Sequence, residues 1–181
     1  DYTTQVFAMR PTGVLDSLGN PIKEAIEISR GITAYGNFFS AGTELEWMAD
    51  VTDFAPLLRD SVDIQTFYDG WKRGPLLTMW FEMVEGTPPM DVYRVEKVYA
   101  GSFRYGDPNN SIENALVPRT FPVGNNGEVA TLKITTTGHG FGGTDNAAEF
   151  SPKTHTVAIN GAQAFSHYLW RDDCGRNPTF P

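Results

Sequence analysis

The sequence predicts an all-β protein, and three observations support this prediction. Apolar and polar residues alternate in short runs, the pattern expected of strands with one buried face. Between these runs lie many of the 18 glycines and 12 prolines, as in chains whose strands are joined by turns. The dipeptide Asn160-Gly161 separates two alternating runs, and Asn-Gly in that position is a strong hairpin signal. Together these features favour an antiparallel sandwich over a parallel α/β sheet.

The first half of the chain contains four segments that predict strands. Residues 62–68 alternate most clearly, and residues 4–9 and 26–29 alternate more loosely. Residues 76–84 form a longer run that is apolar at most positions, which is typical of a strand covered on both faces. Residues 52–58 instead predict one helical turn with a Thr or Asp at its N-cap.

The second half also contains alternating runs that predict strands. Residues 129–137 alternate, and so do residues 154–159 and 164–170 on either side of Asn160-Gly161. The last two runs therefore predict a β-hairpin.

A domain boundary is expected at the two prolines at positions 88–89, because proline cannot donate a hydrogen bond to a neighbouring strand. We therefore expect one domain over residues 1–89 and a second over residues 90–181.

Charge excludes some classes of function. The net charge is −8 and the pI about 4.8. An acidic chain without a Lys/Arg cluster is a poor ligand for nucleic acid or an anionic membrane, because phosphates attract cations. No apolar run approaches the roughly 18 residues of a membrane-spanning helix, and no signal peptide is recognisable.

The histidines do not predict a metal centre. His139, His155 and His167 are far apart and follow no metal-binding spacing. His155, in the middle of a predicted strand, is expected to pack in the core. We therefore expect neither a metal nor another cofactor.

Several segments, in order along the chain, resemble the peptide N-glycosidase F family. Residues 27–35 (Glu-Ile-Ser-Arg-Gly-Ile-Thr-Ala-Tyr) are similar to the family's Glu-Ile-Gly-Arg-Phe-Ile-Thr-Pro-Tyr. Residues 50–54 repeat its Asp-Val-Thr-Asp-Phe, followed by two leucines. Further matches are Gly-Thr-Pro at 86–88, Ala-Glu at 148–149, Thr-His-Thr-Val-Ala-Ile-Asn at 154–160, and Cys174 with Asn177 and Pro178.

The resemblance implies two adjacent antiparallel jelly-roll β-sandwiches with a cleft along their interface. It also implies an amidohydrolase that releases N-linked glycans from asparagine and leaves aspartate. The family's domains are each about as long as this whole chain. Each jelly roll is therefore expected to be incomplete here, with the remaining strands supplied by further chain or by a partner subunit.

Three carboxylates match the family's catalytic positions. Asp1 matches the aspartate that positions or deprotonates the attacking water. Glu149 matches a second carboxylate that stabilises charge, and Asp69 occupies the place of a glutamate. Each has a competing interpretation. Asp1 could be a solvated aspartate at a chain end, and Glu149 a glutamate on a surface loop. Asp69 could be a turn aspartate before Gly70. Asp69 is one methylene shorter than glutamate, about 1.5 Å in reach, which is enough to weaken a positioned hydrogen bond.

Four residues match substrate-binding positions of the family. Trp71 could stack on a sugar ring or pack beneath a loop. His139, among glycines, could bond a ligand or serve the loop alone. Tyr2 stands where the family has an arginine that reads the core sugar, and Phe150 where it has a tryptophan. The loss of a guanidinium removes a strong fork-shaped donor, so these two departures concern substrate identity more than fold.

Other readings of the function remain open at this stage. The same scaffold could be a non-catalytic glycan-binding or cell-surface module, since fold does not fix function. A copper monooxygenase with twin jelly rolls would need histidine pairs and a methionine ligand, which the pattern does not supply. The resemblance further implies a secreted, periplasmic or cell-surface bacterial protein. It also implies a disulfide between Cys174 and a cysteine beyond Pro181.

Overall fold

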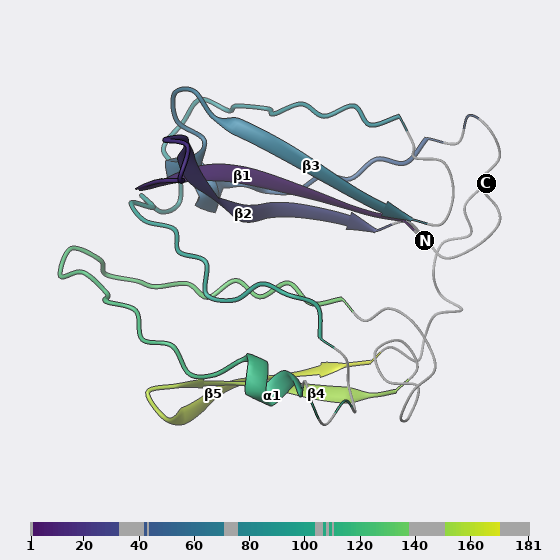
Figure 1. Cartoon of the computed structure of the whole chain (residues 1–181), viewed down its shortest axis with the longest axis vertical. Helices are drawn as coiled ribbons and strands as arrows, with labels where there is room; N and C mark the ends of the chain where they lie inside the picture. The colour runs from purple at the N-terminus through teal and green to yellow at the C-terminus, as the bar shows by residue number, and fades with distance from the viewer. Residues whose placement is uncertain are drawn as a thin grey trace. The chain divides into compact units, whose positions relative to one another are not determined.

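The computed structural model describes residues 2–32, 42, 44–70, 76–103, 107, 109, 111–137 and 151–170. The chain divides into two compact units, Asp1–Lys97 and Val98–Pro181, and each is described by itself. Every strand pair found in the described ranges is antiparallel, and helix is limited to two short elements (Figure 1). The all-β prediction is therefore confirmed. The assignment of residues 1–89 and 90–181 to two jelly rolls stays a prediction.

The first unit is built on a three-stranded sheet in the order β2-β1-β3. Its strands are β1 (Tyr2–Leu15), β2 (Pro21–Ile32) and β3 (Asp63–Gly70). A short loop joins β1 to β2, and Asp16 organises it: its Oδ1 accepts hydrogen bonds from the backbone N–H groups of Leu18 and Asn20, both at 2.8 Å. Gly19 completes the loop at a φ of 84°, which a side chain would strain.

The core of this unit lies against one face of the sheet. Ala8, Ile26 and Ile28 are buried there together with Phe54. Phe54 lies in the 3-10 helix η1 (Thr52–Leu57). The predicted helical turn is therefore confirmed. Partly buried residues surround this cluster: Val6, Val51, Leu57, Leu58, Val62, Ile64 and Val95.

The predicted cap of this helical turn is wrong in detail. The N-cap residue is Val51, and its side chain makes no capping hydrogen bond. The oxygen comes instead from Asp50, one residue earlier, whose Oδ1 accepts from the backbone N–H of Thr52 at 2.9 Å. In a tight 3-10 turn the free N–H groups can be reached from just outside the helix.

A β-bulge interrupts the pairing of β1 with β2. Val6 pairs with Ser29 and Phe7 with Glu27, so Ile28 is an extra residue in β2. Such an insertion resets the alternation of side chains on the bulged strand. Residues on opposite sides of Ile28 can therefore share a face at an odd spacing.

In the part of the second unit that the structure describes, β4 (Lys153–Ile159) and β5 (Ala162–Leu169) form a β-hairpin. Its turn residues Asn160 and Gly161 have φ angles of 52° and 81°, as a two-residue hairpin loop requires. The hairpin predicted from the Asn-Gly dipeptide is confirmed. The unit also holds one helical turn, α1 (Ile112–Ala115), capped by the hydroxyl of Ser111.

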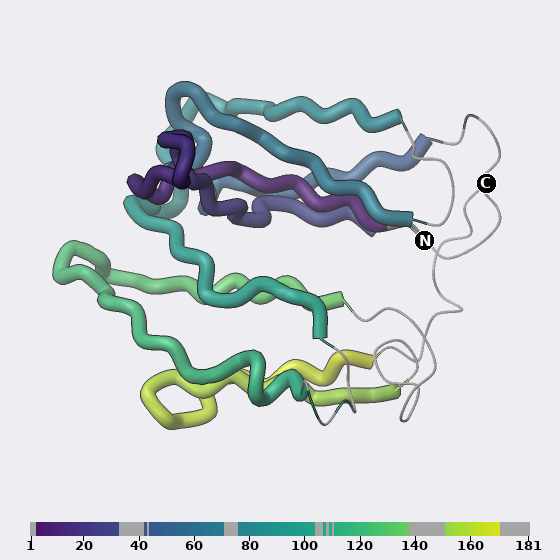
Figure 2. Tube along the Cα trace, viewed as in Figure 1, coloured from purple at the N-terminus to yellow at the C-terminus, as the bar shows by residue number. Residues whose placement is uncertain are grey.

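Two predicted strands are not strands in the structure. Residues 76–84 and 129–137 follow extended paths (Figure 2) but carry no assigned ladder. Alternation determines which way side chains point and does not supply a hydrogen-bonded neighbour. Among the described helices, none is long and apolar enough to cross a membrane.

Candidate functional site

The candidate site lies on the face of the three-stranded sheet opposite the core, which we call the second face. Side chains alternate along β1: Thr4 and Ala8 are buried against the core, so Thr3, Gln5 and Phe7 point the other way. Residues paired across neighbouring strands share a face. The second face therefore also carries their partners in β2 and β3, among them Glu27, Arg30, Phe67 and Asp69.

Asp69 is the predicted catalytic residue whose side chain the structure describes. It is exposed and lies within β3, where it pairs with Thr3. The strand continues through Gly70, which pairs with Tyr2. The alternative interpretation of Asp69 as a turn residue is therefore wrong. Asp69 lies instead at the end of the sheet where β1 begins.

Gln5, Glu27 and Arg30 form a polar cluster on the second face. Arg30 donates from Nε to Glu27 Oε1 at 2.6 Å and from a terminal guanidinium nitrogen to Oε2 at 2.7 Å. Gln5 Nε2 donates to the same Oε2 at 2.7 Å. The side chains of Arg30 and Glu27 are only 20% and 24% exposed. The fork-shaped pairing of guanidinium and carboxylate fixes both groups more firmly than a single contact would.

The bulge at Ile28 explains why this cluster can form. Glu27 and Arg30 are three residues apart, and in a regular strand an odd spacing places side chains on opposite faces. With Ile28 as the extra residue, Glu27 pairs with Phe7 and Arg30 with Gln5, so both point to the second face. The sequence segment that contains the bulge is one of those that carry the family resemblance.

Asp69 and the polar cluster do not touch. Arg30 pairs with Gln5, and Asp69 lies two strands from Arg30 and two register rows further along. Ideal strand spacings place the two Cα atoms roughly 12 Å apart. Phe67, 54% exposed, pairs with Gln5 and lies between them on β3. The second face thus presents a carboxylate, an exposed aromatic ring and a fixed guanidinium–carboxylate pair.

A second charged cluster in this unit anchors residues 94–97 to the strands. Arg10 bonds Glu24 at 2.5 Å and Glu96 at 3.2 Å, and Lys97 donates to the backbone carbonyl of Ala25 at 2.9 Å. The hydrogen bond from Arg94, followed by that from Arg10, holds the pKa of Glu96 below its ordinary value. This cluster is an attachment between segments, and the proposed chemistry makes no use of it.

Most of the predicted site residues lie outside the described residues. These are Asp1, Trp71, His139, Glu149 and Phe150. For Tyr2 the backbone is described, at the start of β1, and the side chain is not. The meeting of three carboxylates in one groove therefore stays a prediction.

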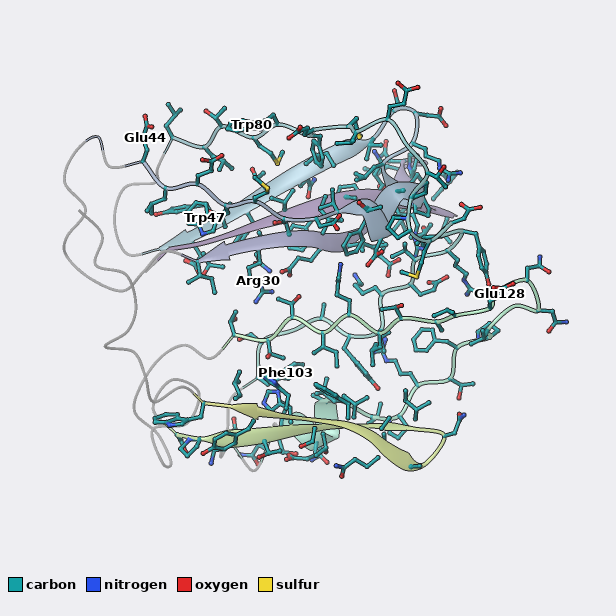
Figure 3. All side chains as sticks on the ribbon, turned by 180° about the vertical axis from the view of Figure 1, so that it is seen from behind. Arg30, Glu44, Trp47, Trp80, Phe103 and Glu128 are labelled. Atoms are coloured by element: carbon teal, nitrogen blue, oxygen red, sulfur yellow. The ribbon has the colours of Figure 1, made fainter. Side chains whose placement is uncertain are left out.

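Trp47 and the polar cluster were missed by the sequence reasoning. The indole of Trp47 lies over Gly31 in β2, and in Figure 3 Trp47 and Arg30 project from opposite sides of the sheet. A Glu-x-x-Arg spacing points to a cluster only if a bulge is assumed. Gly31 was the available signal for Trp47, because a glycine inside a strand often marks a place where another group packs closely on the backbone.

The second unit contains a hollow of about 380 Å³ beside its hairpin. His155 pairs with His167 across the strands, and the ring of Phe165 is parallel to that of His167, with centroids 6.4 Å apart. His155 is half-buried and lines this hollow rather than a closed core. No group of three or more potential metal ligands occurs among the described residues. The full lining is Ile134, Thr135, Thr136, His155, Val157, Phe165, His167 and Leu169.

Comparison with known proteins gives two matches. The protein family described as "Peptide-N-glycosidase F, C terminal" matches residues 108–180. Peptide-N(4)-(N-acetyl-beta-D-glucosaminyl)asparagine amidase F of Elizabethkingia miricola is 33% identical over 168 residues, covering 86% of this chain and 46% of the relative. The chain thus spans about half the length of that relative. No solved structure matches the chain.

Proposed function

Because the chain is related to the peptide-N-glycosidase F family, we propose that the protein it belongs to is an amidohydrolase. Its substrate is an N-linked glycan on a glycoprotein or glycopeptide, and the bond cleaved is the amide between the first sugar and asparagine. The name of the bacterial relative describes this activity for that protein. The proposal extends it to the present chain.

One structural observation supports the proposal most directly. Asp69 is exposed on β3 at the end of the sheet where β1 begins, and Tyr2, at that same end, directly follows Asp1 in the sequence. Asp69 thus lies at the end of β3 that neighbours the start of β1, and β1 begins one residue after Asp1 in the sequence. A sheet holds such positions rigidly, which is what a catalytic constellation needs.

The proposed reaction needs three functions from these residues. A water must lose a proton as its oxygen attacks the amide carbon, the oxyanion must be stabilised, and the leaving glycosylamine nitrogen must gain a proton. We assign the first to Asp1, which then passes the proton taken from the water to the leaving nitrogen. Glu149, in its protonated form, donates a hydrogen bond to the oxyanion. Asp69 assists from β3. The C–N bond breaks, a C–O bond forms, and asparagine becomes aspartate without a change of oxidation state.

Substrate contacts are assigned to the remaining predicted residues. Trp71 stacks on a sugar ring, and His139 and Phe150 line the same site, with Tyr2 in place of the family's arginine. A phenol can donate a single hydrogen bond where a guanidinium offers a fork. The protein therefore binds the core sugar through weaker polar contacts. As a separate part of the proposal, it acts in a secreted, periplasmic or cell-surface location.

A second candidate function is a glycan-binding module without catalysis. Two substitutions favour it: Tyr2 for the arginine and Asp69 for the longer glutamate. Both weaken the polar chemistry of the site and leave the aromatic surface intact. Such a protein would bind glycans and release none.

A glycan-release assay on a denatured glycoprotein, read by mass spectrometry of the former asparagine, tests the proposal. The wild-type protein should convert asparagine to aspartate, and Asp1→Asn should abolish the conversion. Asp69→Asn should reduce it, whereas Asp69→Glu, which restores the family's residue and about 1.5 Å of reach, should preserve or raise it. The exposed Asp91 provides a matched control, and Asp91→Asn should leave release unchanged.

The outcomes separate the candidates. Undiminished release by Asp1→Asn refutes the role of Asp1. Glycan binding by a wild-type protein that releases nothing supports the non-catalytic module instead.

A further inference from the structure

Trp47 packs its indole face directly on the backbone of Gly31. A Cβ added to Gly31 would lie 2.9 Å from Cδ2, 3.1 Å from Cε2 and 3.1 Å from Cγ of Trp47. These are neighbouring atoms of one ring, and their nearly equal distances show that the indole lies flat over the glycine. Any side chain at position 31 would occupy this space. In the family pattern quoted above, position 31 is a phenylalanine, so here Trp47 supplies aromatic surface at this point of β2.

Part of this indole is accessible to a ligand. Trp47 remains 45% exposed although its ring is supported from below by Gly31. It belongs to residues 44–50, which have no regular secondary structure. A ring that is supported on one side has less side-chain entropy to lose when a ligand binds than an unsupported ring has.

The position of this ring is close to the candidate site along the sheet. Gly31 pairs with Thr4, which in turn pairs with Tyr68. That register row is directly next to the row of Thr3 and Asp69. Trp47 thus lies at the same end of the sheet as Asp69, on the core face rather than the second face.

We propose that the exposed surface of the Trp47 indole is a carbohydrate subsite that holds one pyranose ring of a glycan. The apolar C–H face of a sugar packs well on a flat indole, as other large apolar surfaces do. The same segment exposes two carboxylates, Glu44 and Glu46, which are suitable acceptors for sugar hydroxyls. This subsite rests on the proposed function for its ligand class and adds a contact beyond the residues assigned there.

Trp80 shows why the assignment falls on Trp47. It is 67% exposed and belongs to a different segment of the same unit (Figure 3). Exposure alone does not make a sugar platform, because the ring must also be held in place when a ligand binds. The support by Gly31 distinguishes Trp47, and Trp80 therefore provides a matched control.

The competing explanation is structural. β2 is an edge strand of the sheet, and an aromatic ring over a glycine can stabilise such a strand without binding anything. That role predicts a loss of stability on substitution of Trp47 and no change in sugar affinity. The two explanations therefore differ in a measurable way.

The test is a titration of the complete protein with N,N′-diacetylchitobiose, followed by tryptophan fluorescence and by calorimetry. We expect Trp47→Ala to weaken binding at least about tenfold and Trp47→Phe to weaken it less. Gly31→Ala should also weaken binding, because its Cβ displaces the indole while leaving Trp47 in the chain. Trp80→Ala should bind within about twofold of wild type. Urea unfolding of each variant shows whether it is folded under the titration conditions.

Each outcome decides the matter. Equal affinity of folded Trp47→Ala and wild type overturns the subsite, as does the absence of any chitobiose binding by wild type. If wild type binds through Trp47 but releases no glycan, the subsite stands and the amidase proposal fails. If glycan release continues in Trp47→Ala with unchanged KM, the amidase stands and the subsite fails.

Discussion

Replacing Arg30 with methionine removes both guanidinium donors that hold the Glu27 carboxylate on the second face. Methionine keeps a long side chain over the sheet, so the change removes charge and hydrogen bonds more than packing. Glu27 would retain only the bond from Gln5 Nε2 at 2.7 Å. We expect the free energy of unfolding to fall by about 2 kcal/mol.

This magnitude follows from how far the pair is removed from water. Fully exposed ion pairs contribute about 0–1 kcal/mol, and breaking a fully buried pair costs about 3–5 kcal/mol. Arg30 and Glu27 are 20% and 24% exposed and share two hydrogen bonds of 2.6 and 2.7 Å. The expected cost lies between these limits, and Arg30→Lys should lose about half of it because a lysine cannot supply the fork.

The assay is urea unfolding of wild type, Arg30→Met, Glu27→Gln and the double variant. The double-mutant cycle isolates the pair, with an expected coupling of about 1 kcal/mol. Lys23→Met is the control: its ion pair with Asp63 is on the surface, with side-chain exposures of 35% and 61%. It should cost no more than about 0.5 kcal/mol. A coupling near zero, or a Lys23 effect as large as that of Arg30, would refute the reasoning from burial and geometry.

Three other changes test separate parts of the fold. Phe54→Ala empties the centre of the first unit's core, where Phe54 is 9% exposed, and should cost about 3 kcal/mol in urea unfolding; a cost below about 1 kcal/mol would show that the core is not closed there. Gly161→Val places a β-branched residue at a φ of 81° and should unfold the β4–β5 hairpin, seen as lost amide protection, whereas Asn160→Gly should leave protection intact. Glu96→Gln should lower stability at neutral pH, because its folded pKa lies below the ordinary value of 4.5 and its contribution is present above that pH. This difference from wild type should fade as the pH falls through the depressed pKa, and a difference that persists in acid would show that the ion pairs to Arg94 and Arg10 are not its cause.

Local chemistry made part of the fold predictable. Asn160-Gly161 specifies a hairpin because its two φ angles must both be positive, and few residues accept that. Residues 62–68 alternate because one face of β3 packs on the core. Each of these features depends on neighbours in the sequence, so the sequence alone contains the necessary information.

Other features depend on contacts between distant segments and could not be predicted. Residues 76–84 have the composition of a strand, yet pairing requires a second segment at the right distance. The ring of Trp47 over Gly31 joins positions 16 apart in the numbering, and no local pattern indicates which aromatic residue will cover a given glycine.

Of the predicted catalytic residues, Asp69 is the one whose described side chain lies within a regular strand. The family resemblance selected Asp69, and the structure places it on the second face of β3. It did not select the cluster of Gln5, Glu27 and Arg30, because the extra residue Ile28 is what places Glu27 on the same face as the paired Gln5 and Arg30. Among the other predicted residues, Tyr2 is described by its backbone, and Asp1, Trp71, His139, Glu149 and Phe150 lie outside the described residues.

The Arg30–Glu27 pair depends on the number of residues in β2, because Ile28 is the extra residue that brings both side chains to one face. Deleting Ile28 would turn the following residues by one position, so the guanidinium at position 30 would be directed into the apolar side of the sheet. Burying it there without its carboxylate would be costly. Any sequence that keeps this acid–base pair three apart in the same strand must therefore also keep the irregularity. Substitutions should be tolerated more readily at position 28 than a single-codon deletion.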